Sequence, residues 1–218
     1  RDVYKRQLLA WTQVAGQFQG DEGLPLEMAR LVSGRLFNEF AELAGPFAGV
    51  APLCLENVRA GSVGERLDAL QAAILAQEEA AALRDPFAPD WPLAELGFAW
   101  LAGELDGAGV AELDCRQPPL GGFLELQVLP HGEGRLASLR VRRDHDGTLA
   151  GRLLDAWVEC LESIAADRQL PLAGLPLIGA AERERYQAWQ GERVEPAPVE
   201  SLVAAFLSLI HISERAGK

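Results

Sequence analysis

One short stretch of the chain has the residue types of a proton-transfer site, Asp144, His145 and Asp146 followed by Gly147. A histidine beside carboxylates can serve as a general base, because its ordinary pKa lies near neutrality. The same stretch comes after an expected strand and just before an expected helix, where Asp and Gly are common in turns and caps. We therefore favour turn chemistry over catalysis for this stretch.

The remaining histidines, His131 and His211, lie in neither an H-E-x-x-H nor a C-x-x-C context, so we expect no metal site. A nucleophile-elbow sequence, a P-loop and a spaced dinucleotide-binding glycine motif are also missing, and Gly121-Gly122 is interpreted as a loop. The tryptophans at positions 11, 100 and 157 fit apolar stripes or strands, which assigns them to the core rather than to a cofactor or sugar platform.

Three cysteines lie far apart in the sequence, and an odd number cannot all pair within one chain. We expect them to be reduced thiols that pack as small apolar side chains. They are Cys54, Cys115 and Cys160.

The composition indicates an ordinary globular chain rather than a disordered one, with 218 residues of which 49% are hydrophobic. The 32 acidic and 20 basic residues give a net charge of −12, which disfavours nucleic-acid and anionic-membrane partners. The longest apolar run, 202–212, is interrupted by Ser208 and His211 and is shorter than the ~20 residues of a membrane span. No secretory signal opens the chain, so we expect a cytoplasmic location.

The periodicity of apolar residues predicts helices alternating with short strands. Ser62 and Glu65 form an S-x-x-E capping box at the start of the clearest helix, expected over 62–83. The turn 130–134 has the composition of a hairpin and predicts an antiparallel pair. Further helices are expected near 8–18, 149–164 and 180–190, and strands at 25–32, 50–58, 95–101, 123–129 and 136–143. The fold class is therefore α+β, with a mixed, largely antiparallel sheet flanked by helices.

Four segments of the chain match the motifs of one known family. Ser33-Gly34-Arg35 resembles its S-G-R motif, and residues 45–53 (GPFAGVAPL) resemble G-x-F-V-N-T-x-P-L. Pro86-Phe87 resembles the end of H-Q-D-Y-P-F-E, and residues 175–183 (LPLIGAAER) resemble L-P-L-L-x-x-x-E-R. By these motifs the chain resembles the C-terminal half of a nonribosomal peptide synthetase condensation domain and the linker that follows it. The resemblance covers roughly residues 8–206 and implies one lobe of a CoA-dependent acyltransferase fold like that of chloramphenicol acetyltransferase.

The resemblance implies secondary-metabolite chemistry, amide bonds formed between acyl and aminoacyl thioesters on carrier proteins. No cofactor would bind directly, and the phosphopantetheine arms of the carriers would enter a tunnel between two lobes. The implied partners are an N-terminal condensation lobe, a downstream adenylation domain and peptidyl carrier proteins. Docking of an acidic carrier would need a local basic patch, for which Arg140, Arg142 and Arg143 are candidates.

The resemblance also assigns site residues by position. Ser33, Gly34 and Arg35 would support the active site, with Arg35 pairing with the Asp of the family's H-H-x-x-x-D-G motif or, alternatively, lying at a strand end on the surface. The expected tunnel wall comprises Gly45, Phe47, Gly49 and Pro52.

The sequence departs from the family pattern at several positions. Gly49 and Val50 replace Asn and Thr, and Ala82 and Leu83 replace a His-Gln pair. The motif H-H-x-x-x-D-G is not among these 218 residues, so no catalytic residue is assigned and we expect no activity from the chain alone. Whether the chain is an enzyme is therefore left open.

The expected domain organisation is a C-terminal condensation lobe at 8–168 and a linker with the start of an adenylation domain at 169–206. Residues 1–7 and 207–218 resemble translated sequencing-adapter read-through and are expected to be non-native. Two other interpretations stay open, a noncatalytic scaffold or carrier-docking lobe and an unrelated soluble α+β binding protein.

Overall fold

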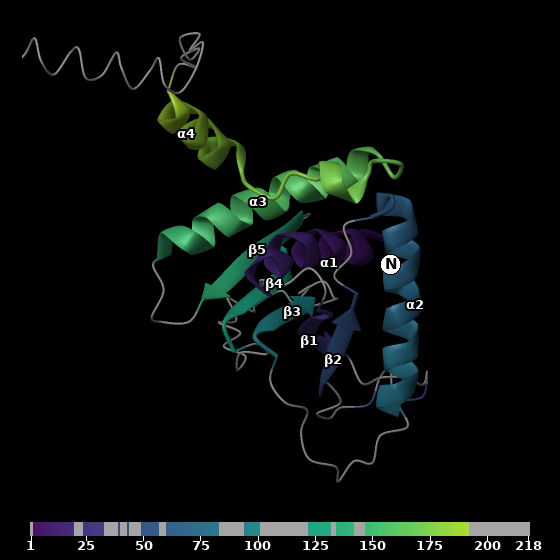
Figure 1. Ribbon diagram of the computed structural model, residues 1–218. Helices are drawn as coiled ribbons and strands as arrows, with labels where there is room; N and C mark the ends of the chain where they lie inside the picture. Colours follow the sequence, from purple (N-terminus) through teal and green to yellow (C-terminus); the bar gives the residue numbers. More distant parts are fainter. Residues whose placement is uncertain are drawn as a thin grey trace, which may run out of the picture. The chain divides into compact units, whose positions relative to one another are not determined.

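Five strands form one mixed sheet in the part of the chain that the structure describes, and helices cover one of its faces (Figure 1). The structure is a computed structural model that describes residues 2–19, 24–32, 39, 43, 49–56, 60–82, 94–100, 122–131, 134–141 and 147–191. Its elements are α1 (Asp2–Ala15), the 3-10 turn η1 (Gly16–Gln19), β1 (Leu26–Val32), β2 (Gly49–Leu55), α2 (Val63–Ala82), β3 (Leu96–Trp100), β4 (Leu124–His131), β5 (Gly134–Val141), α3 (Gly147–Ala166), the 3-10 turn η3 (Leu172–Gly174) and α4 (Ala180–Gln190).

The sheet has the strand order β2-β1-β3-β4-β5 and confirms the predicted mixed α+β class. Its outer pairs, β1 with β2 and β4 with β5, are antiparallel, and its inner pairs, β1 with β3 and β3 with β4, are parallel. The predicted hairpin is confirmed, because β4 and β5 pair from Leu124 opposite Val141 to His131 opposite Gly134. Both parallel pairs need long connections, so they join segments far apart in the sequence.

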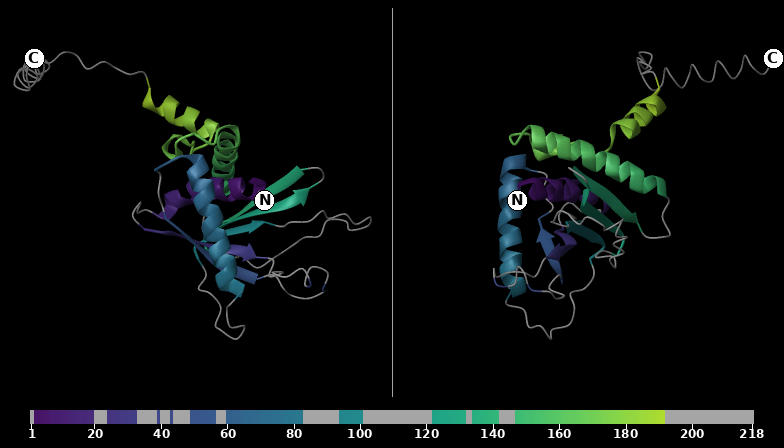
Figure 2. Two further views of the ribbon diagram at one scale, coloured as in Figure 1. Left: turned by 90° about the vertical axis from the view of Figure 1, so that its right-hand side faces the viewer. Right: turned by 180° about the vertical axis from the view of Figure 1, so that it is seen from behind.

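Three helices lie across one face of the sheet (Figure 2). Helix α1 packs on β3, between α2 beside β2 and α3 beside β5. Two buried tryptophans connect these helices to the sheet and to each other by hydrogen bonds from their indole N–H groups. Trp11 donates to the carbonyl of Gly97 in β3 (2.9 Å), and Trp157 in α3 donates to the carbonyl of Gln7 in α1 (3.1 Å). The assignment of these two tryptophans to the core is confirmed.

The capping box at the start of α2 is present as predicted. The Ser62 amide donates to Glu65 Oε2 (2.8 Å), and the Glu65 amide donates to Ser62 Oγ (3.3 Å). The Ser62 amide and the Ser62 hydroxyl, which also donates to Glu65 Oε2 (3.0 Å), stabilise the ionised carboxylate and lower the pKa of Glu65. Behind the box, one stripe of the helix is buried against the core, formed by Val63, Leu67, Leu70 and Ile74.

The segment that follows α3, residues 168–182, which we call the strap, returns to the start of α2. The amides of Val63 and Gly64 donate to the carbonyls of Leu170 (2.9 Å) and Arg168 (2.7 Å), and the Leu172 amide donates to the carbonyl of Gly61 (3.0 Å). The first two bonds satisfy amides of the first turn of α2 that have no partner within the helix. The chain divides between Glu182 and Arg183 into two units, so the strap belongs to the first. The expected boundary between 168 and 169 stays a prediction.

Candidate functional site

The candidate site is the end of the β1–β2 pair where β1 finishes and β2 begins. The predicted site segments, 33–35 and 45–48, connect to the strands at this end. Val32, the last residue of β1, pairs with Gly49, the first residue of β2. The S-G-R segment follows Val32 directly, and residues 45–48 lead directly into Gly49, so both motifs join the sheet at one end of this pair. Ser33, Gly34, Arg35, Gly45 and Phe47 themselves lie outside the described residues.

The two predicted wall residues that the structure describes both lie on β2. Gly49 is half-buried at the start of the strand, and its Cβ position is 3.9 Å from the side chain of Val32. Pro52 is half-buried opposite Ala29 of β1. Proline fits this position because β2 is at an edge of the described sheet. Their role in a tunnel wall stays a prediction.

The sheet face opposite the helices carries a buried polar group that the sequence analysis missed. Along β4, Leu124, Leu126 and Val128 face the helical core, whereas Glu125 and Gln127 alternate to the other face. Gln127 Nε2 donates to Glu125 Oε1 (2.6 Å), and both residues are almost fully buried. The Arg140 guanidinium on β5 lies 4.0 Å from the same carboxylate oxygen.

This polar group has a neighbouring patch of small side chains on the same face. Ala29 of β1 and Ala99 of β3 form a second buried cluster, separate from the core under the helices. Ala29 and Ala99 are 3% and 0% exposed, so this part of the face is covered rather than open to solvent. Arg140, a candidate for carrier docking, thus lies near the carboxylate of Glu125. The other two candidates, Arg142 and Arg143, lie outside the described residues.

Arg30 is a second buried polar residue that the sequence analysis missed. It lies on the core side of β1, where its side chain is 4% exposed. Its guanidinium donates to Gln77 Oε1 (2.9 and 3.0 Å) and to the Tyr4 hydroxyl (3.1 Å), and it lies 3.4 Å from Glu78 Oε1. Burial raises the pKa of Tyr4, and the nearby guanidinium partly opposes this rise.

The strap carries residues 175–182 of the motif L-P-L-I-G-A-A-E-R, and close packing explains two of them. A Cβ at Gly179 would lie 2.9 Å from the Cβ of Asp155 in α3, so the strap can approach the helix this closely only with glycine. Glu182 is buried and forms an ion pair with Arg152 of α3. The Leu177 carbonyl accepts a hydrogen bond from Gln17 Nε2 (3.0 Å).

The histidines and the aspartates beside them, the candidates for proton transfer, do not form a site in the described part of the chain. His131 ends β4, and Asp144, His145, Asp146 and His211 lie outside the described residues. No group of three or more His, Cys, Asp or Glu side chains there is placed to hold a metal ion. Among the described helices, none has the length and apolar character needed to cross a bilayer.

Cys54 and Cys160 are both free thiols, as expected, but only Cys160 packs in the core. Cys160 is buried in α3, where desolvation raises the pKa of its thiol to about 12. Cys54 is exposed, because alternation along β2 buries Leu53 and Leu55 and turns the residue between them outward. Cys115 lies outside the described residues.

Comparison with solved structures identifies the fold. The chain is similar to the condensation domain from monacolin K polyketide synthase MokA, with a TM-score of 0.65 and 15% identity over 78% of this chain and 42% of that one. It is also similar to a four-domain nonribosomal peptide synthetase bound to AMP and glycine, with a TM-score of 0.62 and 15% identity over 83% of this chain and 16% of that one. The first condensation domain of the CDA synthetase gives a TM-score of 0.56 and 14% identity over 79% of this chain and 41% of that one.

The chain therefore has a condensation-domain-like fold and spans about two-fifths of the length of the separate condensation domains that it matches. No family model matches the sequence.

Proposed function

We propose that the chain is the C-terminal half of a condensation domain, which forms amide bonds between carrier-bound thioesters together with an N-terminal half. The observation that carries this proposal is that about four-fifths of the chain superimposes on about two-fifths of the solved condensation domains. The strap supports it, because the residues that resemble the linker signature pack against α3 through Gly179 and Glu182. On this proposal an adenylation domain follows the strap, and residues 183–206 lead into it.

The proposed reaction transfers an acyl group between two phosphopantetheine arms. The acceptor amine attacks the carbonyl carbon of the donor thioester, so that a C–N bond forms and the C–S bond breaks. The proton lost by the nitrogen goes to the leaving thiolate, and the products are an amide and a free thiol. The contribution of this half is to position the two thioesters, which replaces an encounter in solution by a fixed geometry.

Arg35 is the residue through which this half would act on the catalytic motif of the other half. In the sequence it is three positions after Val32, the last residue of β1, and Val32 pairs with Gly49, which directly follows the segment 45–48. We propose that its guanidinium pairs with the Asp of H-H-x-x-x-D-G and holds the catalytic loop. Arg35 is thus a positioning residue and not a catalytic one.

The test is reconstitution with the upstream coding sequence of the same gene. Amide formation between two loaded carrier proteins is followed by mass spectrometry of the acceptor carrier. We expect product from the complete domain, a loss of tenfold or more with Arg35→Ala, and unchanged activity with Arg168→Ala on the exposed side of the strap. A normal rate with Arg35→Ala refutes its role, and an upstream sequence without H-H-x-x-x-D-G refutes amide formation.

A noncatalytic carrier-docking lobe is the second candidate, and one observation favours it. The position where the family has Asn is Gly49, which places no polar side chain at the end of the β1–β2 pair. This candidate predicts that a loaded carrier protein shifts backbone amide signals of the chain although no amide product forms. Unshifted signals at an excess of carrier would count against docking.

A further inference from the structure

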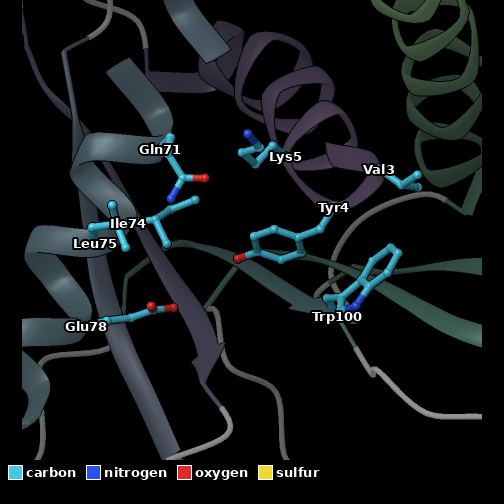
Figure 3. A pocket seen from close by; sticks show the side chains of 8 residues that line it. All are labelled: Val3, Tyr4, Lys5, Gln71, Ile74, Leu75, Glu78 and Trp100. Atoms are coloured by element: carbon cyan, nitrogen blue, oxygen red, sulfur yellow. The ribbon is translucent and has the colours of Figure 1, made fainter. Parts of the chain in front are cut away.

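A cavity of about 410 Å³ lies between α1, α2 and the end of β3 (Figure 3). Three of the side chains that line it, Val3, Tyr4 and Lys5, belong to the segment 1–7 that is expected to be non-native. A ligand site built on these side chains would not belong to the natural protein, so the cavity is assigned no ligand. Helix α4, in contrast, lies within the expected linker, and its attachment to α3 carries an inference about that linker.

Helix α4 is too short and too exposed to be stable by itself. It has 11 residues, Ala180–Gln190, and every residue from Glu184 to Gln190 is exposed. Isolated helices shorter than about 12–15 residues are marginal in water, because few hydrogen bonds offset the cost of forming the first turn. Most helices in proteins are stabilised instead by burial of an apolar face, which this exposed run does not have. The stability of α4 must therefore depend on its first turn.

Another helix supplies the cap of that first turn. The first amides of a helix have no partner within it, and a Ser, Thr, Asp or Asn side chain just before the helix commonly accepts from one of them. Gly179 occupies this position in α4 and has no side chain to offer. The amide of Ala180 donates instead to Glu159 Oε1 of α3, which lies 21 positions earlier in the chain. The helix thus begins only where α3 provides an acceptor.

A second contact joins the first turn of α4 to the same face of α3. Glu182 forms an ion pair with Arg152, and its side chain is 9% exposed. Arg152 and Glu159 are about two helical turns apart on α3, so both lie on one face. A carboxylate in the first turn also interacts favourably with the helix dipole. We call these two contacts, Ala180 with Glu159 and Glu182 with Arg152, the latch.

We propose that α4 is a conditional helix, which is folded while the latch is closed and unfolds locally when the latch opens. The chain divides into its two units between Glu182 and Arg183, directly after the latch, so two side chains of the first unit control a helix that continues into the second. This inference does not depend on the amide-forming function.

The latch also controls an exposed aromatic pair. Tyr186 and Trp189 pack edge to face with their ring centroids 5.5 Å apart, and the Trp189 side chain is 72% exposed. Residues three positions apart lie side by side on a helix, so the pair is formed only while α4 is helical. A partner that binds both rings would therefore favour the closed latch.

Hydrogen exchange of the full chain, followed by mass spectrometry, measures the opening of α4 separately from that of the sheet. Glu159→Ala removes the cap, and we expect the amides of 184–190 to exchange about fivefold faster, the size of a lost helix cap. The amides of β1 and β4 should exchange as in the unchanged chain, because the latch lies outside the sheet. The matched control is Glu162→Ala, the same substitution at an exposed position of α3, which should leave α4 unaltered.

A second variant opens the latch at its other contact. Arg152→Met takes the ion-pair partner away from the buried carboxylate of Glu182, so it should accelerate exchange at 184–190 at least as much as Glu159→Ala does. Its control is Arg168→Met, since Arg168 pairs with the exposed Asp68 (3.5 Å) away from α4. The proposal is overturned if Glu159→Ala and Glu162→Ala give the same exchange in α4, or if α4 opens only together with β1 and β4. Exchange of α4 at the rate of an unfolded chain before any substitution would also overturn it.

Discussion

Replacement of Gly179 by alanine tests whether the strap is fixed to the rest of the first unit. The added Cβ would lie 2.9 Å from Asp155 Cβ and 3.5 Å from the Ala156 amide nitrogen. Ordinary contacts between carbon atoms need about 3.5 Å, and a Cβ fixed to helix α3 cannot rotate away. The strap must therefore withdraw by roughly half an ångström. We expect Gly179→Ala to lower the free energy of unfolding by about 1–3 kcal/mol, the range for overpacked sites.

Gly151 provides a matched control in α3. No heavy atom lies within 4 Å of a Cβ placed there, and an alanine in a helix interior is favoured over glycine by up to about 1 kcal/mol. Gly151→Ala should therefore raise the free energy of unfolding, so the two substitutions have opposite signs.

Urea denaturation followed by circular dichroism measures both variants, and hydrogen exchange reports on the strap itself. The Leu172 amide, which donates to Gly61, should exchange faster in Gly179→Ala than in the unchanged chain. If Gly179→Ala leaves both the unfolding midpoint and this exchange rate unaltered, the strap is not held where the structure places it.

Three further predictions concern buried ionisable groups. Arg30→Met should destabilise the chain by about 2–4 kcal/mol, because several buried hydrogen bonds are lost together, whereas Glu78→Gln, with a side chain 42% exposed, should cost less than about 1 kcal/mol in the same urea titration. The raised pKa of Tyr4 keeps its phenol neutral in the folded chain at pH values where the phenol of the unfolded chain ionises. The free energy of unfolding should therefore fall as the pH rises above 10.0, and it should fall less steeply in Tyr4→Phe. Equal slopes of unfolding free energy against pH in the two chains would contradict this. With a thiol pKa of about 12, Cys160 should resist iodoacetamide at pH 8 while the exposed Cys54 is alkylated. Peptide mass spectrometry measures both modifications. Rapid alkylation of Cys160 in the folded chain would be inconsistent with its burial.

Local patterns in the sequence predicted most of the individual elements. The expected helix at 62–83 is α2, and its capping box forms because both partners lie within four residues. The expected strands at 123–129 and 136–143 are β4 and β5, paired by the hairpin between them. In each case the interaction that determines the structure is short in sequence, so it can be inferred from residue types and spacing.

The parts that the sequence did not predict depend on contacts between distant segments. One such part is the placement of β3 between β1 and β4, in parallel to both. Residue types near each strand do not specify which strands become neighbours across long connections. The buried Arg30 is another, although one signal was present. Arg30 is an even number of residues from the buried Leu26 and Met28, so the alternation of side chains along β1 predicts that it lies on the core face of the strand.

Predictions about the candidate site divide in the same way. The family resemblance placed Ser33, Gly34 and Arg35 directly after a strand, and β1 does end at Val32. The buried pair Glu125 and Gln127 escaped notice, since alternating polar residues in a strand ordinarily indicate a solvated face.

The proline in β2 has a consequence for how the chain associates. An edge strand offers backbone amides and carbonyls to any other extended chain, which is a route to aggregation. Pro52, in the middle of this strand, has no amide hydrogen and so interrupts the row of donors. A substitution such as Pro52→Val would restore a donor and raise the strand propensity. Pro52, which is expected to line a tunnel, thus also disfavours the pairing of a further strand with β2 at this edge of the described sheet.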